Sequence, residues 1–368
     1  MRRILVVLAA LTALFTTLQA QQSWHSEFGF QIGYTRVKPA GTGASDHIDV
    51  FSIPAFNLPG IVPAGASLFA IIPWKNKVAV ETSAGFAQGN TIALIGDGTF
   101  FDLGLRANYA FTPKIYAAAG GRLNWIESGG VSETQLGVQA AIGYRFGFIA
   151  GLRGRVEANA SFLGTSEQLA PANTYGVEFG VSKQLGATAR ARSSAPARNA
   201  RAWQPALGIQ GGYTRAHGVG GAGDVTSFAF PVFGGSTTTL GSPSGPPVLF
   251  VILPIGKKLA IEPGLDINRL QTQGQTVFAG NVVARLNYAV SGGWYAAAGG
   301  NLVYVKATGA DAENITGANL AWGYRFPLVA GLGGRFELNY TMMAKNDNIP
   351  FPPINTFGAL LAATMPLK

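Results

Sequence analysis

The chain has 368 residues, of which 48% are hydrophobic and only 12% are charged, and it contains 50 glycines and no cysteine. This composition is unusual for a soluble domain and suits a protein with lipid on one side. Without cysteine, a disulfide framework and a thiolate metal site are excluded. Part of the net charge of +9 is concentrated in one arginine-rich stretch, so it is weak evidence for nucleic-acid binding, and we expect none.

The N-terminus has the three-part pattern of a cleavable secretory signal. Arg2 and Arg3 precede an apolar run over 4–15, and the small-residue ending Leu18-Gln19-Ala20 follows. We therefore expect residues 1–20 to be a signal peptide that directs export through the Sec pathway. No later stretch supplies the roughly 18 uninterrupted apolar residues that a helical span requires, so a membrane protein of this sequence would cross with strands.

Alternation with a period of two predicts eight strands in the first half of the mature chain. In one segment, Leu103 and Leu105 share a face while Asp102 and Arg106 share the other. The expected strands lie near 27–37, 66–74, 76–88, 102–111, 114–127, 134–146, 150–163 and 174–184.

The connections between these segments alternate in length. "WKNK", "FTPK" and "GFIAG" are tight turns, whereas residues 38–65 are expected to form a long loop. Short turns on one side, long loops on the other and an even strand number are typical of a transmembrane β-barrel. An interfacial girdle of aromatic residues is expected beside the tight turns, formed by Trp74, Tyr109, Phe111, Tyr116, Tyr144 and Phe146.

The hexapeptide "YAAAGG" occurs at 116–121 and again at 295–300, and its surroundings match as well. "GYTR", "NYA" and "GYRF" recur at nearly the same offset, which indicates a tandem duplication. The predicted organisation is a first eight-stranded repeat at 21–185, an Arg/Ala/Ser-rich periplasmic linker at 186–201 and a second eight-stranded repeat at 202–368.

In strand number and connection lengths, each copy resembles the small outer-membrane barrels of the OmpA transmembrane domain, OmpX and OmpW type. "GYRF" and "YAAAGG" are loose echoes of that family, and the chain departs from it by ending in "ATMPLK" without a terminal aromatic residue. The resemblance implies an all-β, antiparallel up-and-down barrel in the outer membrane of a diderm bacterium. It also implies contact with outer-membrane lipids and with the barrel assembly machinery.

Charged residues fall on the inward phase of the predicted strands, where we expect a lumen network of ion pairs. The first copy contributes Glu81, Asp102, Arg106, Arg122, Arg145, Arg153, Arg155, Glu157 and Glu178. The second copy contributes Glu262, Asp266, Arg285, Arg325, Arg335 and Glu337. Four first-copy charges are replaced, Asp102 by Asn281, Arg122 by Asn301, Arg153 by Gly333 and Glu178 by Leu360. Loss of two acids together with two bases is expected if the charges pair in a low-dielectric interior.

Two arrangements of the copies remain open. Two tandem eight-stranded barrels would have lumens filled by side chains, whereas one sixteen-stranded barrel could enclose an aqueous channel. The balanced charges and the linker at 186–201 favour two barrels.

The sequence predicts no catalytic residue, cofactor or metal site. Asp46, His47 and Asp49 could in principle hold a metal or form an acid-base pair, but the second copy lacks the histidine. We therefore expect a structural or surface-interaction role rather than an enzyme. A porin-like channel for small solutes and a passage for small hydrophobic molecules are the alternatives. The last of these would use a candidate apolar mouth that could bind a small hydrophobic ligand, formed by Pro54, Phe56, Pro231 and Phe233.

Overall fold

The computed structural model describes residues 24–39, 47–53, 68–92, 96–167, 171–185, 202–218, 225–230, 249–272, 274–328, 331–344 and 354–367. Within these ranges the chain is all β apart from one short 3-10 turn, η1 (Ile149–Gly151), and no helix could span a bilayer. The predicted signal peptide and linker lie outside the described residues.

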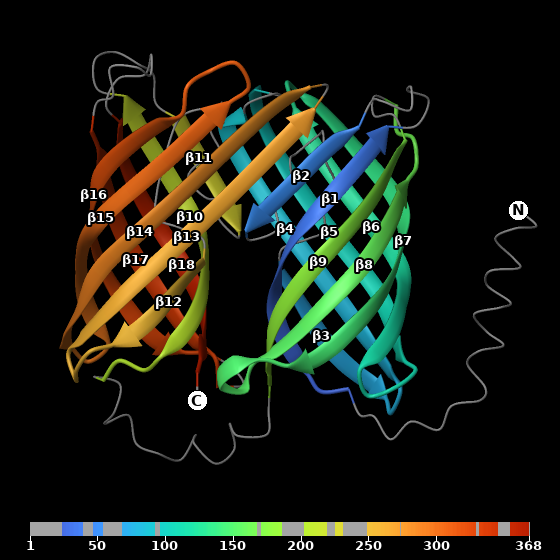
Figure 1. The fold of residues 1–368 in the computed structure, drawn as a ribbon, viewed down its shortest axis with the longest axis horizontal. Coiled ribbons are helices and arrows are strands. Elements are labelled where there is room, and N and C mark those ends of the chain that lie inside the picture. The colour runs from blue at the N-terminus through green and yellow to red at the C-terminus, as the bar shows by residue number, and fades with distance from the viewer. Residues whose placement is uncertain are drawn as a thin grey trace, which may run out of the picture.

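The strands are antiparallel (Figure 1). Burial alternates along them, as expected when successive side chains point to the lumen and to the outer surface. The strands of the first copy are β1 (Glu27–Pro39), β2 (Ile48–Ile53), β3 (Leu68–Lys75), β4 (Val78–Ile92), β5 (Gly96–Ala110), β6 (Ile115–Ser128), β7 (Val131–Gly147), β8 (Arg153–Leu163) and β9 (Ala172–Gln184). Those of the second copy are β10 (Ala206–Gly218), β11 (Val225–Phe230), β12 (Leu249–Pro254), β13 (Leu259–Thr272), β14 (Gln275–Ser291), β15 (Trp294–Ala307), β16 (Glu313–Pro327), β17 (Gly333–Met343) and β18 (Ile354–Pro366).

Two eight-stranded barrels stand side by side, which confirms the predicted fold class (Figure 1). We call the side with the tight turns the turn side and the opposite side the loop side. In the turn-side half of the first barrel, β3 pairs with β1 and with β4, and β9 closes onto β1. In the second, β12 pairs with β10 and with β13, and β18 closes onto β10.

The loop-side halves depart from two independent barrels. The expectation that residues 38–65 form a loop is wrong in part, because β2 lies within this segment and pairs with the loop-side half of β1. The free edge of β2 then pairs with β13 of the second copy over six residue pairs, from Ile53 opposite Ile267 to Ile48 opposite Thr272.

The second copy makes the reciprocal exchange. β11 pairs with β10 of its own copy and then with β4 of the first copy, from Phe230 opposite Phe86 to Ser227 opposite Gly89. The hydrogen-bonded order on the loop side is therefore one closed ring of sixteen strands that runs through both copies: β4 to β9, β1, β2, β13 to β18, β10, β11 and back to β4. The two barrels are separate only in their turn-side halves.

An apolar cluster contains residues of both copies, and strand alternation places several of them on the outer surfaces that face each other. Phe30 and Val181 of the first copy and Ile209 and Met365 of the second are each no more than 5% exposed. Lys183 Nζ also donates a hydrogen bond to the carbonyl of Pro366. The apolar outer face of β3 is explained in part by Leu68, a member of this cluster.

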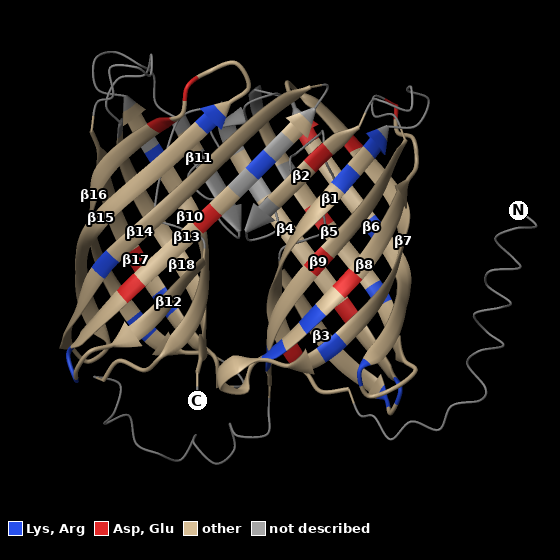
Figure 2. Ribbon diagram, in the orientation of Figure 1, with Lys and Arg blue, Asp and Glu red and all other residues tan. Residues whose placement is uncertain are grey.

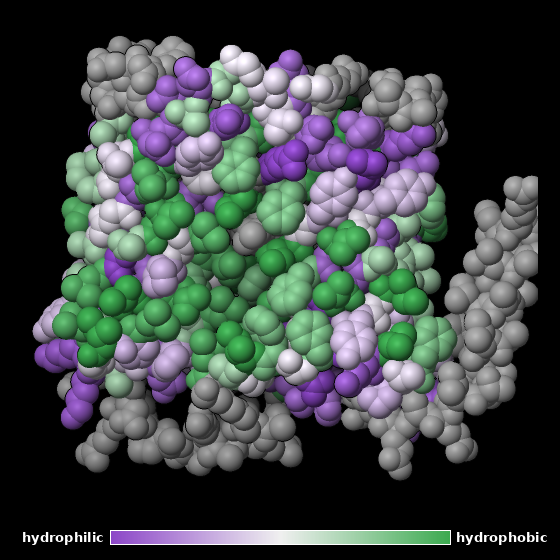
Figure 3. Space-filling view, in the orientation of Figure 1, coloured by the Kyte–Doolittle hydropathy of each residue, from purple (hydrophilic) through white to green (hydrophobic). Residues whose placement is uncertain are grey.

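The outer surface carries a hydrophobic band with more hydrophilic ends (Figure 3). Large apolar residues such as Leu105, Leu136, Val138 and Leu320 are at least half exposed on this surface. An apolar exterior of this kind requires lipid around it, because exposure of this surface to water would be unfavourable.

The aromatic girdle is present with one correction. Trp74 and Tyr144 are exposed beside the turns, at 69% and 44% of their surface. Tyr116, which was expected in the girdle, is completely buried and points into the lumen. The reason is strand phase, because Tyr116 shares its face with Ala118 and Gly120, both of which are inward.

The repeated hexapeptide is constrained from inside the barrels. A Cβ atom on Gly120 would lie 2.4 Å from the Cα of Arg106, and one on Gly299 would lie 2.5 Å from the Cα of Arg285. Only glycine lets the strand pass the backbone of the arginine-bearing neighbour at this distance.

The strand exchange predicts one specific cross-link. Phe51 of β2 lies directly opposite Arg269 of β13. Opposed residues on antiparallel strands have Cβ atoms about 5 Å apart, close to disulfide geometry. Phe51→Cys combined with Arg269→Cys should oxidise to a disulfide that keeps the two copies joined after cleavage at a protease site inserted in the linker.

The matched control is Phe51→Cys with Gln88→Cys, because Gln88 is the first-copy counterpart of Arg269. This pair should keep free thiols. Oxidation of the control pair, with none between positions 51 and 269, would show that each copy closes by itself.

Candidate functional site

A buried ion-pair cluster, which we call the first plug, fills the lumen of the first barrel. It consists of Glu81, Arg106, Tyr116, Arg155 and Glu157. Arg106 donates to both oxygens of Glu157 at 2.6 Å and to Glu81 at 2.8 Å. Arg155 donates to both oxygens of Glu81 at 2.7 and 2.8 Å, and the hydroxyl of Tyr116 donates to Glu157 at 2.6 Å. The charges along the strands are visible in Figure 2.

The second plug repeats this arrangement in the second barrel with Glu262, Arg285, Tyr295, Arg335 and Glu337. Arg285 donates to both oxygens of Glu337 at 2.7 Å and to Glu262 at 2.8 Å. Arg335 donates to Glu262 at 2.5 Å, and Tyr295 donates to Glu337 at 2.6 Å. The charged side chains of the two plugs are no more than 8% exposed.

An aromatic layer closes each lumen on the turn side of its plug. Trp24 Nε1 donates to the carbonyl of Lys77 at 2.9 Å, and the guanidinium of Arg145 lies 3.7 Å from the centre of the Trp24 ring. In the second barrel, the guanidinium of Arg325 lies 3.9 Å from the centre of the Trp203 ring. Sequence reasoning missed both tryptophans, although their equal offset from "YAAAGG" could have revealed them.

Two further charged pairs belong to the first barrel alone. Arg122 Nε donates to Asp102 at 2.9 Å, and both residues are replaced by asparagine in the second copy. Arg153 pairs with Glu27 at 3.3 Å, and these positions become Gly333 and Ala206. In both cases acid and base were replaced together. Glu27, a partner that the sequence analysis did not single out, therefore explains the change at Arg153.

Glu178 is the one acid whose replacement has no matching base. It is 3% exposed, lies directly opposite Glu157 on the neighbouring strand, and accepts a hydrogen bond from Gln31 at 2.5 Å. Within the described residues it makes no ion pair. In the second copy Leu360 takes its place, and Gln210, the counterpart of Gln31, accepts instead from Arg335 at 2.9 Å. A buried carboxyl group thus lies beside the first plug and has no counterpart beside the second.

The remaining predicted residues lie outside the plugs. Asp266 accepts from Asn281 at 3.4 Å in the second lumen. His47 lies 3.6 Å from Asp49, which also pairs with Arg36 at 2.7 Å on the loop side. Among the described residues no group of three or more His, Asp or Glu side chains could hold a metal ion. The candidate apolar mouth, Pro54, Phe56, Pro231 and Phe233, lies outside the described residues.

The plugs are chemically suited to sealing a lumen. Arg106 and Arg285 each bridge the two carboxylates of their plug. The tyrosine hydroxyl adds a second donor to a carboxylate oxygen that the arginine already contacts. Charges held this way in a low-dielectric interior are stable only as a set, because removal of one partner leaves another buried charge uncompensated.

Comparison with protein-family models and with curated proteins gives no match. Solved structures similar to this chain include Ail, the attachment invasion locus protein of Yersinia pestis, in complex with the heparin analogue sucrose octasulfate, at 17% identity, with 43% of this chain and 99% of that chain covered and a TM-score of 0.26. The CymD monoaromatic hydrocarbon channel is 9% identical, with 97% and 92% covered and a TM-score of 0.28.

A loop-deletion mutant of OmpT, an outer membrane protein of Vibrio cholerae, is 10% identical, with 92% and 99% covered and a TM-score of 0.25. Similarities this distant carry no argument about function. The closed antiparallel barrels, the apolar outer band and the aromatic girdle make this chain an outer-membrane β-barrel protein.

Glu178 and its second-copy counterpart Leu360 predict opposite effects on stability when each residue is replaced by the other. Glu178→Leu should raise the temperature at which the folded band is lost in a heat-modifiability gel, because it removes a buried acid that faces Glu157. Leu360→Glu should lower that temperature, because it places an acid beside Glu337.

Glu157→Leu serves as the control for a broken pair. It should destabilise the barrel by about 3–5 kcal/mol, since it leaves the two buried guanidiniums of the first plug with a single carboxylate. If Glu178→Leu were as damaging as Glu157→Leu, Glu178 would be an integral member of the first plug.

Proposed function

We propose that this protein is a non-conducting outer-membrane barrel with a structural or surface-interaction role, and that it is not an enzyme. The observation that carries the proposal is the closure of both lumens by a buried plug and an aromatic layer. An eight-stranded barrel leaves an interior just wide enough for side chains to fill.

Permeation through either turn-side half would have to displace a plug. In the first barrel an ion would have to separate Arg106 from both Glu81 and Glu157, whose side chains are at most 2% exposed. It would then meet the Trp24 and Arg145 layer, where the cation already lies over the indole ring. Breaking such a network opposes passage by several kcal/mol.

The loop-side half supports an outward-facing role. Its ring of sixteen strands is wider than either barrel below it, but that width ends where β3 and β12 separate the two lumens. The loop-side ring therefore presents a broad surface above two lumens that are each closed by a plug. Partners would approach from the loop side, whereas lipids and the barrel assembly machinery would contact the outer walls.

The porin-like alternative makes the opposite electrical prediction, so planar-bilayer recording tests the proposal directly. The purified full-length protein should give no steady conductance at neutral pH. A large stable conductance from the wild type would overturn the proposal and favour a channel.

A variant with an opened first lumen provides the positive control. It should conduct, because two acids and two bases leave together, so the lumen is widened without a change in its net charge. The substitutions are Glu81→Ser, Arg106→Ser, Arg155→Ser and Glu157→Ser, combined with Trp24→Ala. Equivalent changes in the second copy should add a second conductance of similar size.

A further inference from the structure

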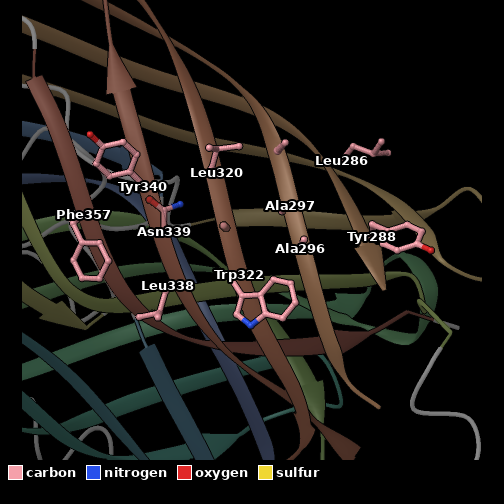
Figure 4. A pocket seen from close by; sticks show the side chains of 12 residues that line it. Leu286, Tyr288, Ala296, Ala297, Leu320, Trp322, Leu338, Asn339, Tyr340 and Phe357 are labelled. Carbon is pink, nitrogen blue, oxygen red and sulfur yellow. The ribbon is translucent and has the colours of Figure 1, made fainter. Parts of the chain in front are cut away.

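A shallow groove of about 610 Å³ lies on the outer wall of the second barrel, across β14 to β18 (Figure 4). Its lining is almost entirely apolar and faces the bilayer. The outward-pointing side chains that form it are Leu286, Tyr288, Ala296, Ala298, Leu320, Trp322, Leu338, Tyr340 and Phe357.

Two alanines of the repeated hexapeptide form the floor of this groove, which we call the furrow. Ala296 lies between Tyr288 on β14 and Trp322 on β16. One step further along β15, Ala298 lies between Leu286 and Leu320. Since neighbouring strands are about 4.8 Å apart, the large side chains on either side stand about 10 Å apart, which suits a hydrocarbon chain.

The first copy carries a shorter furrow along β6, because only one of its two outward alanines has large neighbours on both sides. Ala117 lies between Tyr109 and Ile142, whereas Ala119 lies between two further alanines on β5 and β7. The inward half of the hexapeptide is explained by the contact with the arginine-bearing strand, but that contact places no demand on the outward alanines. Leucine or valine occupies many of the surrounding outward positions.

A lysine lies at the turn-side end of each furrow. The Nζ atom of Lys258 is 5.7 Å from the ring centre of Tyr288, which itself lines the groove. In the first copy, Nζ of Lys114 is 6.0 Å from the ring centre of Tyr144, two residues beyond Ile142 on β7. Both lysines are exposed, so each places a positive charge where the furrow meets the headgroup region.

We propose that each barrel binds one phospholipid of the turn-side leaflet, with an acyl chain in the furrow and an anionic headgroup at the lysine. Charge favours this occupant over a second copy of the chain. Two copies joined face to face through the groove would bring Lys258 against Lys258, whereas a phosphate would be attracted there.

The test counts phospholipids retained by the full-length protein in native mass spectrometry, after reconstitution with phosphatidylglycerol and extraction in mild detergent. The wild type should retain two. Ala296→Leu with Ala298→Leu should retain one, as should Ala117→Leu with Ala119→Leu, and the fourfold variant should retain none. Heat-modifiable mobility shows that each variant is folded.

Matched controls separate a site from general adhesion of lipid. Thr82→Leu with Ala84→Leu, two outward positions of β4 away from both furrows, should still retain two. Lys258→Ala should lower the number of retained phosphatidylglycerol molecules from two to one, whereas Lys257→Ala should leave two.

Three outcomes would overturn the proposal. The first is a wild type that retains no phospholipid, and the second is retention that the leucine substitutions leave unchanged. The third is a dimer of the wild type that dissociates when the furrow is filled, which would make a second copy the occupant.

Discussion

Backbone hydrogen bonding inside a bilayer is the constraint on which the rest of this structure depends. No water reaches the strand edges there, so each edge must pair with another strand. In the loop-side half, β2 leaves one edge unpaired within its own copy, and so does the end of β4. These edges pair with β13 and β11. The two copies therefore complete each other, and the ring of sixteen strands follows from closure.

The same low dielectric governs the charges in the two lumens. Two guanidiniums and two carboxylates hold each plug, and they are the same residues in both copies. Outside the plugs, the second copy replaces two first-copy ion pairs, each as a pair: Asp102 with Arg122, and Glu27 with Arg153. Glu178 alone was replaced without a basic partner, which indicates that it is an addition to the first plug rather than part of it. A buried acid and its basic partner are therefore kept or lost together, because either charge alone would be uncompensated in the lumen.

The hexapeptide "YAAAGG" shows how one strand serves both faces of a barrel wall. Tyr116 and Tyr295 complete the plugs from inside, and Gly120 and Gly299 let the strand pass the arginine-bearing neighbour. The outward alanines form the furrow floor. The sequence analysis put Tyr116 in the girdle, because the preference of tyrosine for the interface competed with strand phase.

Period-two alternation, turn lengths and the internal repeat were enough to predict a membrane barrel in two copies and most of the inward charges, because each of these is a local pattern. Which charge meets which, the aromatic layers of Trp24 and Trp203, and the position of β2 depended on contacts between distant segments. The exchange between copies is the clearest case, because β2 is a short strand whose partner is set by the edge left free in the other copy. Only the closed tertiary structure decides where that edge lies.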